Sequence, residues 1–280
     1  MTNAPAEPPV LLSIEDGLAL ITLNRPAQLN ALTQEMSERL EQTFADVGSN
    51  PDVRVVVIAG AGKGFCAGAD MGRLQGLVAD KGAGLASRRP EDPHPVYDAL
   101  DAPDYLRSRL LAPMAMPQPV IAAINGACAG VGLAIAVASD IRFGSPTALF
   151  SAAFPRRGLT AEAGLAWSLP RIVGRAAASD MMLSGRRITA AEAEKMGLLN
   201  SVIEEDVLAH ALAYAKDIAA NCSPRSTRTI KRQLRLAADQ TQREAVILAY
   251  DEVVASLACD DFQEGVASFV EKRAPKFTGR

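Results

Sequence analysis

The apolar residues in the first 60 positions form short runs that are separated by turn-forming residues. The runs Val10–Ile14 and Leu18–Leu23 flank the dipeptide Asp16-Gly17, which is typical of a tight turn between antiparallel strands. A third run, Val53–Ala59, is largely β-branched and apolar, which favours a parallel strand that is buried on both faces. The pattern therefore predicts a hairpin and then a buried strand.

A helix is predicted between the second and the third run. Thr33 suits the N-cap, the residue at which a helix begins, because its hydroxyl can accept a backbone N–H. The apolar residues that follow recur at spacings of four, four and three: Met36, Leu40, Phe44 and Val47. This spacing places them on one face, and Gly48 is expected to end the helix.

A longer apolar stretch, Pro119–Ser139, predicts a strand, a turn and a buried helix in that order. The strand breaks at Asn125-Gly126, and the Ala-rich helix follows Gly130-Val131-Gly132. A helix that begins after a glycine turn directs free N–H groups at one point, which suits an oxygen that becomes negative during a reaction. A plain turn between buried elements would show the same pattern. The run approaches the ~20 apolar residues of a membrane span, but Asn125 and the glycines disfavour one.

A second junction of this kind lies at Gly60–Met71, with the sequence GAGKGFCAGADM. A phosphate loop would need a glycine at Val57 and a serine or threonine at Gly64, so the spacing does not match. The glycines also fall as G-x-G-x-G, which is not the dinucleotide-binding pattern. Asp70 is placed to begin a helix, and the two junctions together could supply two convergent N–H donors.

Length and charge exclude some classes of function. The chain has 280 residues, which is long for one domain but compatible with one domain and a tail of helices. Its formal net charge of -3 provides no basic surface for nucleic acid or anionic membranes. The only histidines, His94 and His210, lie far apart, so a catalytic triad or a histidine-rich metal site is poorly supported.

The cysteines have no zinc-binding spacing and lie at Cys66, Cys128, Cys222 and Cys259. Their scatter, mostly in apolar surroundings, predicts reduced thiols and a cytoplasmic protein. The first ten residues lack a basic region and a long apolar core, so we expect no secretory signal there.

Several motifs, taken in order, resemble those of the crotonase superfamily, the enoyl-CoA hydratases and isomerases. They are LNRPAQLNALT, FCAGADM, PQPVIAAINGACAGVGLAIAVASDIRF, LPRIVGRAAASDMMLSGRRITAAEAEKMGLLNSVI and FVEKRAPKF, and they cover nearly the whole chain. The resemblance implies an α/β fold in which residues 1–205 form a crotonase-like spiral of ββα units with the acyl-CoA site. It implies a helical C-terminal trimerisation region over residues 206–280.

The resemblance also implies an acyl-CoA thioester substrate whose carbonyl oxygen lies between two backbone N–H groups, those of Ala69 and Val131. Further residues at substrate- or CoA-binding positions of the family are Arg25, Ala27, Leu29, Ala67, Gly68, Asp70, Met71 and Gly130. Phe269 and Lys272 match residues that reach the CoA of a neighbouring subunit, as in a homotrimer or hexamer, although an exposed terminal helix would look the same. No separate cofactor is implied, because coenzyme A is part of the substrate.

Hydratases of this family use two glutamates, and the matched positions here hold Ala134 and Phe154. The usual acid–base pair for adding water is therefore missing. Glu162 instead lies where some Δ3,Δ2-enoyl-CoA isomerases carry a single catalytic glutamate, before a helix that contains Trp167. We expect Phe154 and Trp167 to form an apolar pocket that makes this carboxylate a better base. Alternatively, Glu162 only complements the helix dipole.

The sequence thus predicts an isomerase that works through Glu162 and a thioester enolate. Two alternatives stay open: hydration or thioester hydrolysis by water held on Glu162, and a non-catalytic protein that binds acyl-CoA. Glu192, by contrast, is expected to be structural, because Thr189 and Glu192 have the spacing of a capping box.

The segment Gly72–Met116 is predicted to begin as a long loop, and the resemblance places it over the acyl pocket. We expect His94 to be a solvated residue of this loop and Tyr97–Leu111 to form a short helix. Helices are expected from Asp206 onward, including one that begins at Ser223-Pro224.

Two pairs of charged residues remain. Asp140 and Arg142 match a family motif, and we expect them to form a buried structural pair. Arg156 and Arg157 could contact phosphate, but a solvated basic face is the favoured interpretation.

Overall fold

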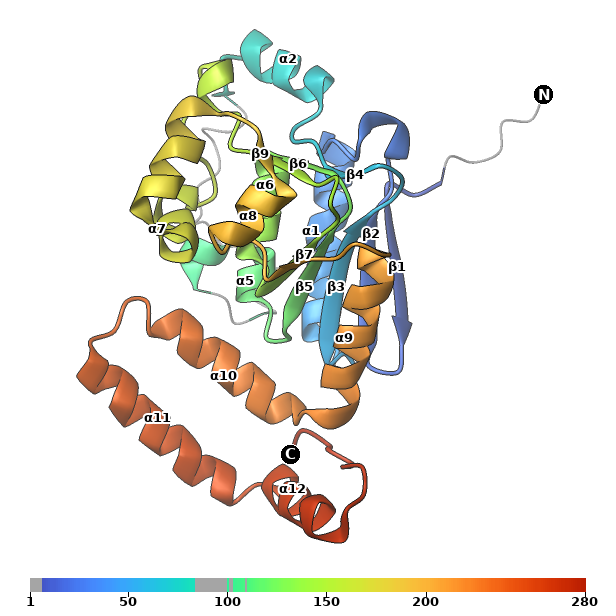
Figure 1. Ribbon diagram of the computed structural model, residues 1–280, viewed down its shortest axis with the longest axis vertical. Coiled ribbons are helices and arrows are strands. Elements are labelled where there is room, and N and C mark those ends of the chain that lie inside the picture. Colours follow the sequence, from blue (N-terminus) through green and yellow to red (C-terminus); the bar gives the residue numbers. More distant parts are fainter. Residues whose placement is uncertain (1–6, 84–99, 101–102, 109) are drawn as a thin grey trace, which may run out of the picture.

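A six-stranded sheet forms the centre of the computed structural model, which describes residues 7–83, 100, 103–108 and 110–280 (Figure 1). The strand order is β1-β2-β3-β5-β7-β10. The strands span β1 (Val10–Glu15), β2 (Leu18–Leu23), β3 (Val55–Gly60), β5 (Val120–Ile124), β7 (Ile141–Gly144) and β10 (Ser201–Val202). Strands β1 and β2 are antiparallel, and every other neighbouring pair in this sheet is parallel.

A smaller, four-stranded sheet has the order β4-β6-β8-β9. Its strands are β4 (Gly64–Cys66), β6 (Ala127–Ala129), β8 (Leu149–Ser151) and β9 (Ile188–Thr189). Strand β6 runs parallel to both β4 and β8, whereas β9 is antiparallel to β8. Because β3 leads into β4 and β5 leads into β6, neighbouring strands of the large sheet continue into neighbouring strands of the small one.

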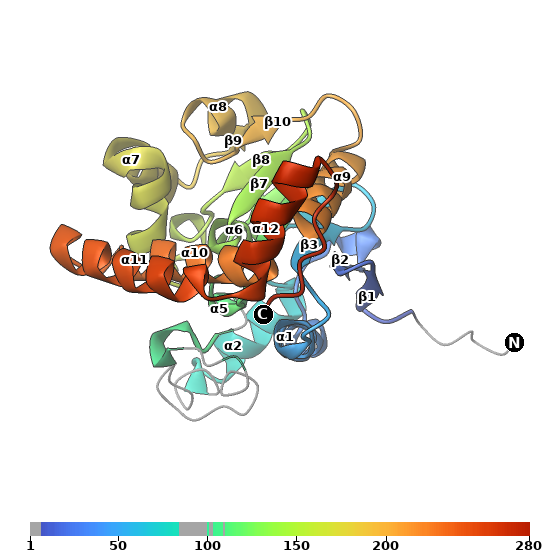
Figure 2. The same ribbon diagram turned by 90° about the horizontal axis from the view of Figure 1, so that it is seen from below.

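Helices cover both sheets and extend beyond them at the C-terminal end (Figures 1 and 2). The α-helices are α1 (Gln34–Ser49), α2 (Met71–Ala79), α5 (Ala112–Ala115), α6 (Val131–Ala138), α7 (Leu165–Ser184), α8 (Ala190–Lys195), α9 (Val207–Asn221), α10 (Pro224–Leu236), α11 (Gln242–Leu257) and α12 (Asp260–Glu271). Short 3-10 turns are η1 (Pro26–Gln28), η2 (Asp104–Leu106) and η3 (Pro155–Arg157). The chain therefore has the mixed α/β fold that the resemblance implied.

The predicted hairpin and buried strand are both confirmed. Asp16 and Gly17 have φ values of 50° and 79°, as a two-residue hairpin turn requires. Strand β3 begins at Val55, two residues later than predicted, and is buried on both faces. Val56 and Ile58 belong to the main core, whereas Val55 and Val57 face a second core under α9.

Helix α1 is confirmed at its start but not at its end. Thr33 accepts a hydrogen bond from the N–H of Met36 at 3.1 Å, as an N-cap does. Gly48 does not end the helix, which continues through Ser49. A Cβ atom at Gly48 would lie 2.3 Å from Cδ2 of Leu100, so close packing is what requires glycine there.

Two other expectations about elements need correction. Within Pro119–Ser139, the chain forms the short strand β6 between the turn and the helix, which the apolar pattern did not reveal. The start of Gly72–Met116 is helical rather than a loop, because α2 runs to Ala79. His94 lies outside the described residues. Of Tyr97–Leu111 only part is described, and it includes the turn η2.

Asp140 and Arg142 are both structural, but they do not form a direct pair. Asp140 accepts a bond from the N–H of Val120 and makes an ion pair of 2.7 Å with Lys231. Arg142 is buried and donates to the backbone carbonyls of Leu198 and Ser139. Lys231, on α10, also donates to the carbonyl of Gln118 and so joins α10 to the start of β5.

The C-terminal helices α10 to α12 lie beside the sheets rather than over them (Figure 1). Ser223 caps α10 and Pro224 is its first residue, as predicted. Helix α11 has no buried residue, and large apolar side chains are exposed along it: Val246, Ile247, Tyr250, Val253, Val254 and Leu257. An exposed apolar face of this kind marks a surface that a partner would cover.

Candidate active site

The two glycine junctions lie side by side because the strands before them are neighbours. Cys66 of β4 pairs with Cys128 of β6 in a parallel register, so both strands end at the same edge of the small sheet. The chain then turns at Gly68 and at Gly130 before helices α2 and α6 begin. A Cβ atom at Gly130 would lie only 3.9 Å from the Cα atom of Gly68. The two turns are therefore in contact.

These turns leave one N–H group in each junction directed away from the core. Leu32 donates its N–H to Gly68 and accepts that of Asp70, so the N–H of Ala69, between them, points to the other side. Val131 is the first residue of α6, where an N–H has no partner within the helix. Among the described residues, neither N–H donates to a backbone carbonyl.

A small cavity of about 50 Å³ lies where these groups meet the segment that connects β8 with α7. The junctions contribute Ala67, Ala69, Leu74, Gly130 and Val131 to its wall. The segment contributes Ala153, Phe154, Arg157, Leu159 and Glu162. The structure thus brings Glu162 to the same cavity as both predicted N–H donors, although these residues are far apart in the sequence.

The segment that carries Glu162 has an unusual backbone. Ala153 and Ala163 have φ values of 48° and 49°, in the left-handed region that disfavours side chains. Gly158 and Gly164 have positive φ as well. Strained positions of this kind cluster at functional sites, and here they flank Phe154 and Glu162. Glu162 is half-buried and lies three residues before α7, as predicted.

The positions of the two hydratase glutamates hold buried apolar residues in the fold as well. Ala134 is packed in the core from α6, and Phe154 lines the cavity. Glu162 is consequently the only carboxylate among the described residues of the cavity wall. Trp167 does not share this wall, contrary to expectation. It is exposed, and the guanidinium carbon of Arg171 lies 3.8 Å from its ring centre.

Arg25 is engaged within the protein. Its guanidinium donates to the carbonyl of Ala31 and, at 3.1 Å, to the carboxylate of Asp70. Asp70 is the N-cap of α2, and the bond from Arg25, followed by that from the N–H of Gly72, holds the pKa of Asp70 below its usual range. Ala27 and Leu29 are exposed on the same loop. This loop is therefore tied to the start of α2.

Four residues of the cavity wall were not predicted: Leu74, Ala153, Arg157 and Leu159. Leu74 lies on α2, in a segment interpreted as a loop. Arg157 was interpreted as solvated, and it is exposed, yet it also lines the cavity. Its sequence signal was weak because it lies at the end of the short turn η3, directly before the left-handed Gly158, where no periodic pattern indicates which side a residue faces.

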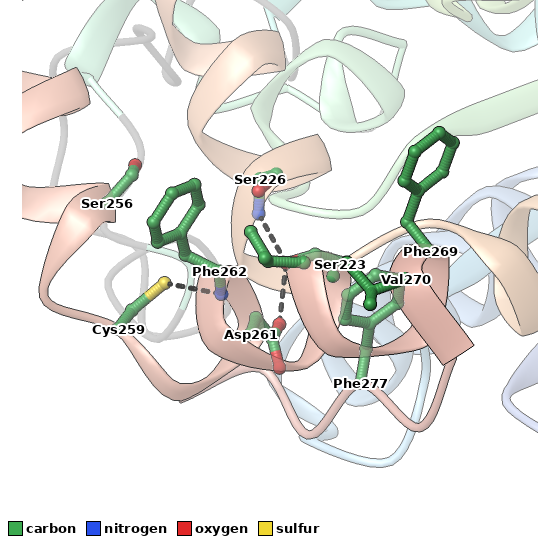
Figure 3. A pocket seen from close by; sticks show the side chains of 11 residues that line it. Ser223, Ser226, Ser256, Cys259, Asp261, Phe262, Phe269, Val270 and Phe277 are labelled. Carbon is green, nitrogen blue, oxygen red and sulfur yellow. Dashed lines mark hydrogen bonds between the residues drawn. The ribbon is translucent and has the colours of Figure 1, made fainter. Parts of the chain in front are cut away.

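Phe269 and Lys272 lie far from this cavity in α12 and at its C-terminal end. Phe269 is 85% exposed and lines a groove of about 540 Å³ between α10, α12 and the C-terminal tail. In Figure 3 its ring points away from the hydrogen bond between Ser223 and Asp261. Lys272 is exposed. Neither residue contributes to the described wall of the cavity in its own chain.

The remaining reactive groups do not add to the site. The four cysteines are free thiols, and burial raises the pKa of Cys66 to about 12. His210 is exposed and packs edge-to-face on Phe143 of the second core, with ring centres 4.7 Å apart. Glu192 forms the predicted capping box with Thr189. No cluster of metal-ligand side chains occurs in the described parts of the chain.

Comparison with known proteins identifies the family to which this geometry belongs. The model of the enoyl-CoA hydratase/isomerase family matches residues 13–92 and 102–280. The chain belongs to the enoyl-CoA hydratase/isomerase family. It is therefore an acyl-CoA enzyme of that family, and the recognised resemblance to crotonases is confirmed.

Relatives within the family carry names of both reaction types. The probable enoyl-CoA hydratase echA12 of Mycobacterium bovis is 38% identical over 93% of this chain and 89% of its own length. The 1,2-epoxyphenylacetyl-CoA isomerase of Escherichia coli is 31% identical over 97% of this chain and 98% of its own. The crystal structure of an enoyl-CoA hydratase from Polaromonas sp. JS666 matches with a TM-score of 0.83 at 30% identity, over 96% and 99% of the two chains.

The described helices include none with both the length and the apolar character needed to cross a bilayer.

Proposed function

We propose that this family member is a Δ3,Δ2-enoyl-CoA isomerase that uses Glu162 as its single acid–base group. The observation that carries the proposal is the cavity wall, where Glu162 is the only described carboxylate and lies with Ala69 and Val131. Isomerisation needs one base and a stabilised oxyanion. It does not need the second carboxylate that Ala134 and Phe154 fail to provide.

The reaction moves one proton and no other atom. Glu162 takes a proton from C2 of a 3-enoyl thioester, and the electron pair moves onto the thioester oxygen as an enolate. The N–H groups of Ala69 and Val131 donate to that oxygen. The protonated carboxyl of Glu162 then returns its proton to C4, which gives the 2-enoyl thioester and restores the carboxylate.

Hydration or thioester hydrolysis by water on Glu162 is the second candidate, because a similar relative carries the name of a hydratase. Such a reaction would have to position and deprotonate water with one carboxylate. A third possibility is that the protein binds acyl-CoA without turnover. In each case coenzyme A is part of the substrate, so we propose that the protein needs no separate cofactor. We also propose that it is located in the cytoplasm.

Exchange of the C2 proton with deuterated solvent separates these candidates. The isomerase should exchange C2 protons of a 3-enoyl-CoA and yield 2-enoyl-CoA, followed by NMR or mass spectrometry. Glu162→Gln should fold and bind CoA normally but lose about 10²–10⁴ in both rates, since both pass through one enolate. Glu192→Gln is the matched control and should keep both rates. Wild-type exchange in Glu162→Gln would overturn the assignment, and binding without exchange would support the third possibility.

We further propose that the enzyme is a homotrimer, or two trimers paired as a hexamer. The exposed apolar face of α11 and the exposed Phe269 support a homo-oligomer, because such faces need a partner. In it, Phe269 and Lys272 would reach the CoA of a neighbouring subunit. Sedimentation at micromolar concentration should show no dominant monomer. An active monomer would remove the proposed role of Lys272.

A further inference from the structure

Arg157 is the one charged residue of the described cavity wall that the proposed isomerisation does not use. It is the last residue of η3, and Gly158, with a φ of 68°, turns the chain directly after it. Within the described parts of the chain its guanidinium makes a single hydrogen bond, to the carbonyl of Ala153 at 3.4 Å. A guanidinium has five N–H donors, so most of its donor capacity is open to a ligand.

The neighbours of Arg157 in this wall make a hydrocarbon an unfavourable partner for it. Phe154, Leu159 and Leu74 surround the same small space and offer no acceptor from their side chains. A hydrocarbon chain in this space would displace water from the guanidinium and replace it with nothing, which costs free energy. A carboxylate would replace the lost water with paired, charge-assisted bonds that match the planar guanidinium.

The size of the cavity limits where such a carboxylate can be. Its volume is about 50 Å³, and since about 10–15 Å³ on this measure holds one water molecule, only a few atoms of an acyl group fit inside it. Ala69, Val131, Glu162 and Arg157 consequently face the same few atoms of a bound acyl group. The group that meets Arg157 must lie within a few bonds of the reacting carbons C2 to C4.

We propose that Arg157 binds a carboxylate on the acyl group, so that the preferred substrates are CoA thioesters of short unsaturated dicarboxylic acids. The inference rests on the proposed function, in which Glu162 acts at C2. It also accounts for charge: the substrate carboxylate would otherwise repel both Glu162 and the enolate, and Arg157 offsets that repulsion. Arg157 thereby determines specificity and takes no part in proton transfer.

Two thioesters that differ at one carbon provide the test. The first is 3-pentenoyl-CoA, and the second is its analogue in which C5 is a carboxylate. We would measure kcat/KM for C2 exchange with both in the wild type, Arg157→Leu and Arg157→Lys. Arg156→Leu is the matched control, because Arg156 is outside the cavity wall and donates to the carbonyl of Ser184 at 3.0 Å.

The wild type and Arg156→Leu should prefer the carboxylate by about 10–100-fold, the value of a hydrogen-bonded charge pair. The preference should vanish or reverse in Arg157→Leu and be intermediate in Arg157→Lys, which retains the charge but not the planar fork. If Arg157→Leu does not fold, Arg157→Lys alone decides. Equal rates with both thioesters in the wild type, or an unchanged preference in the Arg157 variants, would overturn the inference. Exchange with neither thioester would instead overturn the proposed function, and the inference with it.

Discussion

The two glycine junctions and the segment 153–164 line the same cavity, but they contribute different kinds of groups. The junctions provide backbone N–H groups, and their turns are packed against each other and continue directly from buried strands. The segment provides side chains from a 3-10 turn and an irregular backbone with strained alanines. We infer that the two regions have different roles. The packed sheet determines where the thioester oxygen is held, and the segment determines which chemistry and which acyl group follow.

Removing a donor from a junction should have the largest effect. Val131→Pro deletes one N–H at the first position of α6, where proline is well tolerated in helices. The fold should survive, and kcat/KM for C2 exchange should fall by about 10²–10³. The variant's circular dichroism and CoA affinity serve as controls. A folded Val131→Pro protein with unchanged turnover would show that Val131 does not hold the oxyanion.

Adding a methyl group to a junction should reduce the stability of the fold. A Cβ atom at Gly132 would lie 2.2 Å from the carbonyl oxygen of Cys66, so Gly132→Ala must displace the backbone of β4. We expect a loss of about 1–3 kcal/mol or more in the free energy of unfolding, measured with urea. The matched control is Gly76→Ala on α2, where nothing lies within 4 Å. That change should stabilise by up to about 1 kcal/mol. Equal effects of both would mean that the junctions are not tightly packed.

Replacing alanine by glycine in the segment 153–164 should raise the free energy of unfolding, whereas glycine to alanine in a junction lowers it. Ala163 has a φ of 49°, which costs about 1–2 kcal/mol for a side chain, so Ala163→Gly should relieve strain. Greater freedom of glycine in the unfolded chain offsets part of this gain, and the net increase in unfolding free energy should stay under about 1 kcal/mol. If the strain helps to position Glu162, C2 exchange should slow while thermal stability rises. A destabilised variant would show that the segment is not strained at Ala163.

The smallest effect should come from the ion pair that joins the loop of Arg25 to the first junction. The pKa of Asp70 is lower in the folded protein than the value of 3.8 in the unfolded chain. The ion pair of Asp70 therefore adds stability at pH values above 3.8. That contribution is lost as the pH falls through the folded value. Asp70→Asn should therefore be less stable than the wild type at pH 7, by under about 1 kcal/mol for a partly exposed pair. The two unfolding curves should converge in acid below pH 3.8. A constant difference across this range would show that the charge of Asp70 does not stabilise the fold.

The sequence alone determined those elements that depend only on residues near one another in the chain. The hairpin at Asp16-Gly17, the two-sided burial of β3 and the cap at Thr33 follow from turn chemistry, periodicity and capping, which act over a few residues. Both junctions were likewise visible as glycines between apolar runs. Motif order identified the family, which the comparison confirmed. Local patterns missed β6, because three residues carry too little periodicity to show a strand.

Only the tertiary structure decided which of these groups meet. The register of β4 on β6 brings Gly68 beside Gly130, and no local pattern specifies a pairing between strands so distant in sequence. The segment between β8 and α7 brings Arg157 and Leu159 into the cavity wall, whereas Trp167, expected there, is exposed. Alanine carries no sequence signal for a left-handed backbone, since packing around it imposes that conformation. The sequence thus specified the chemical groups, and long-range packing selected those that share one cavity.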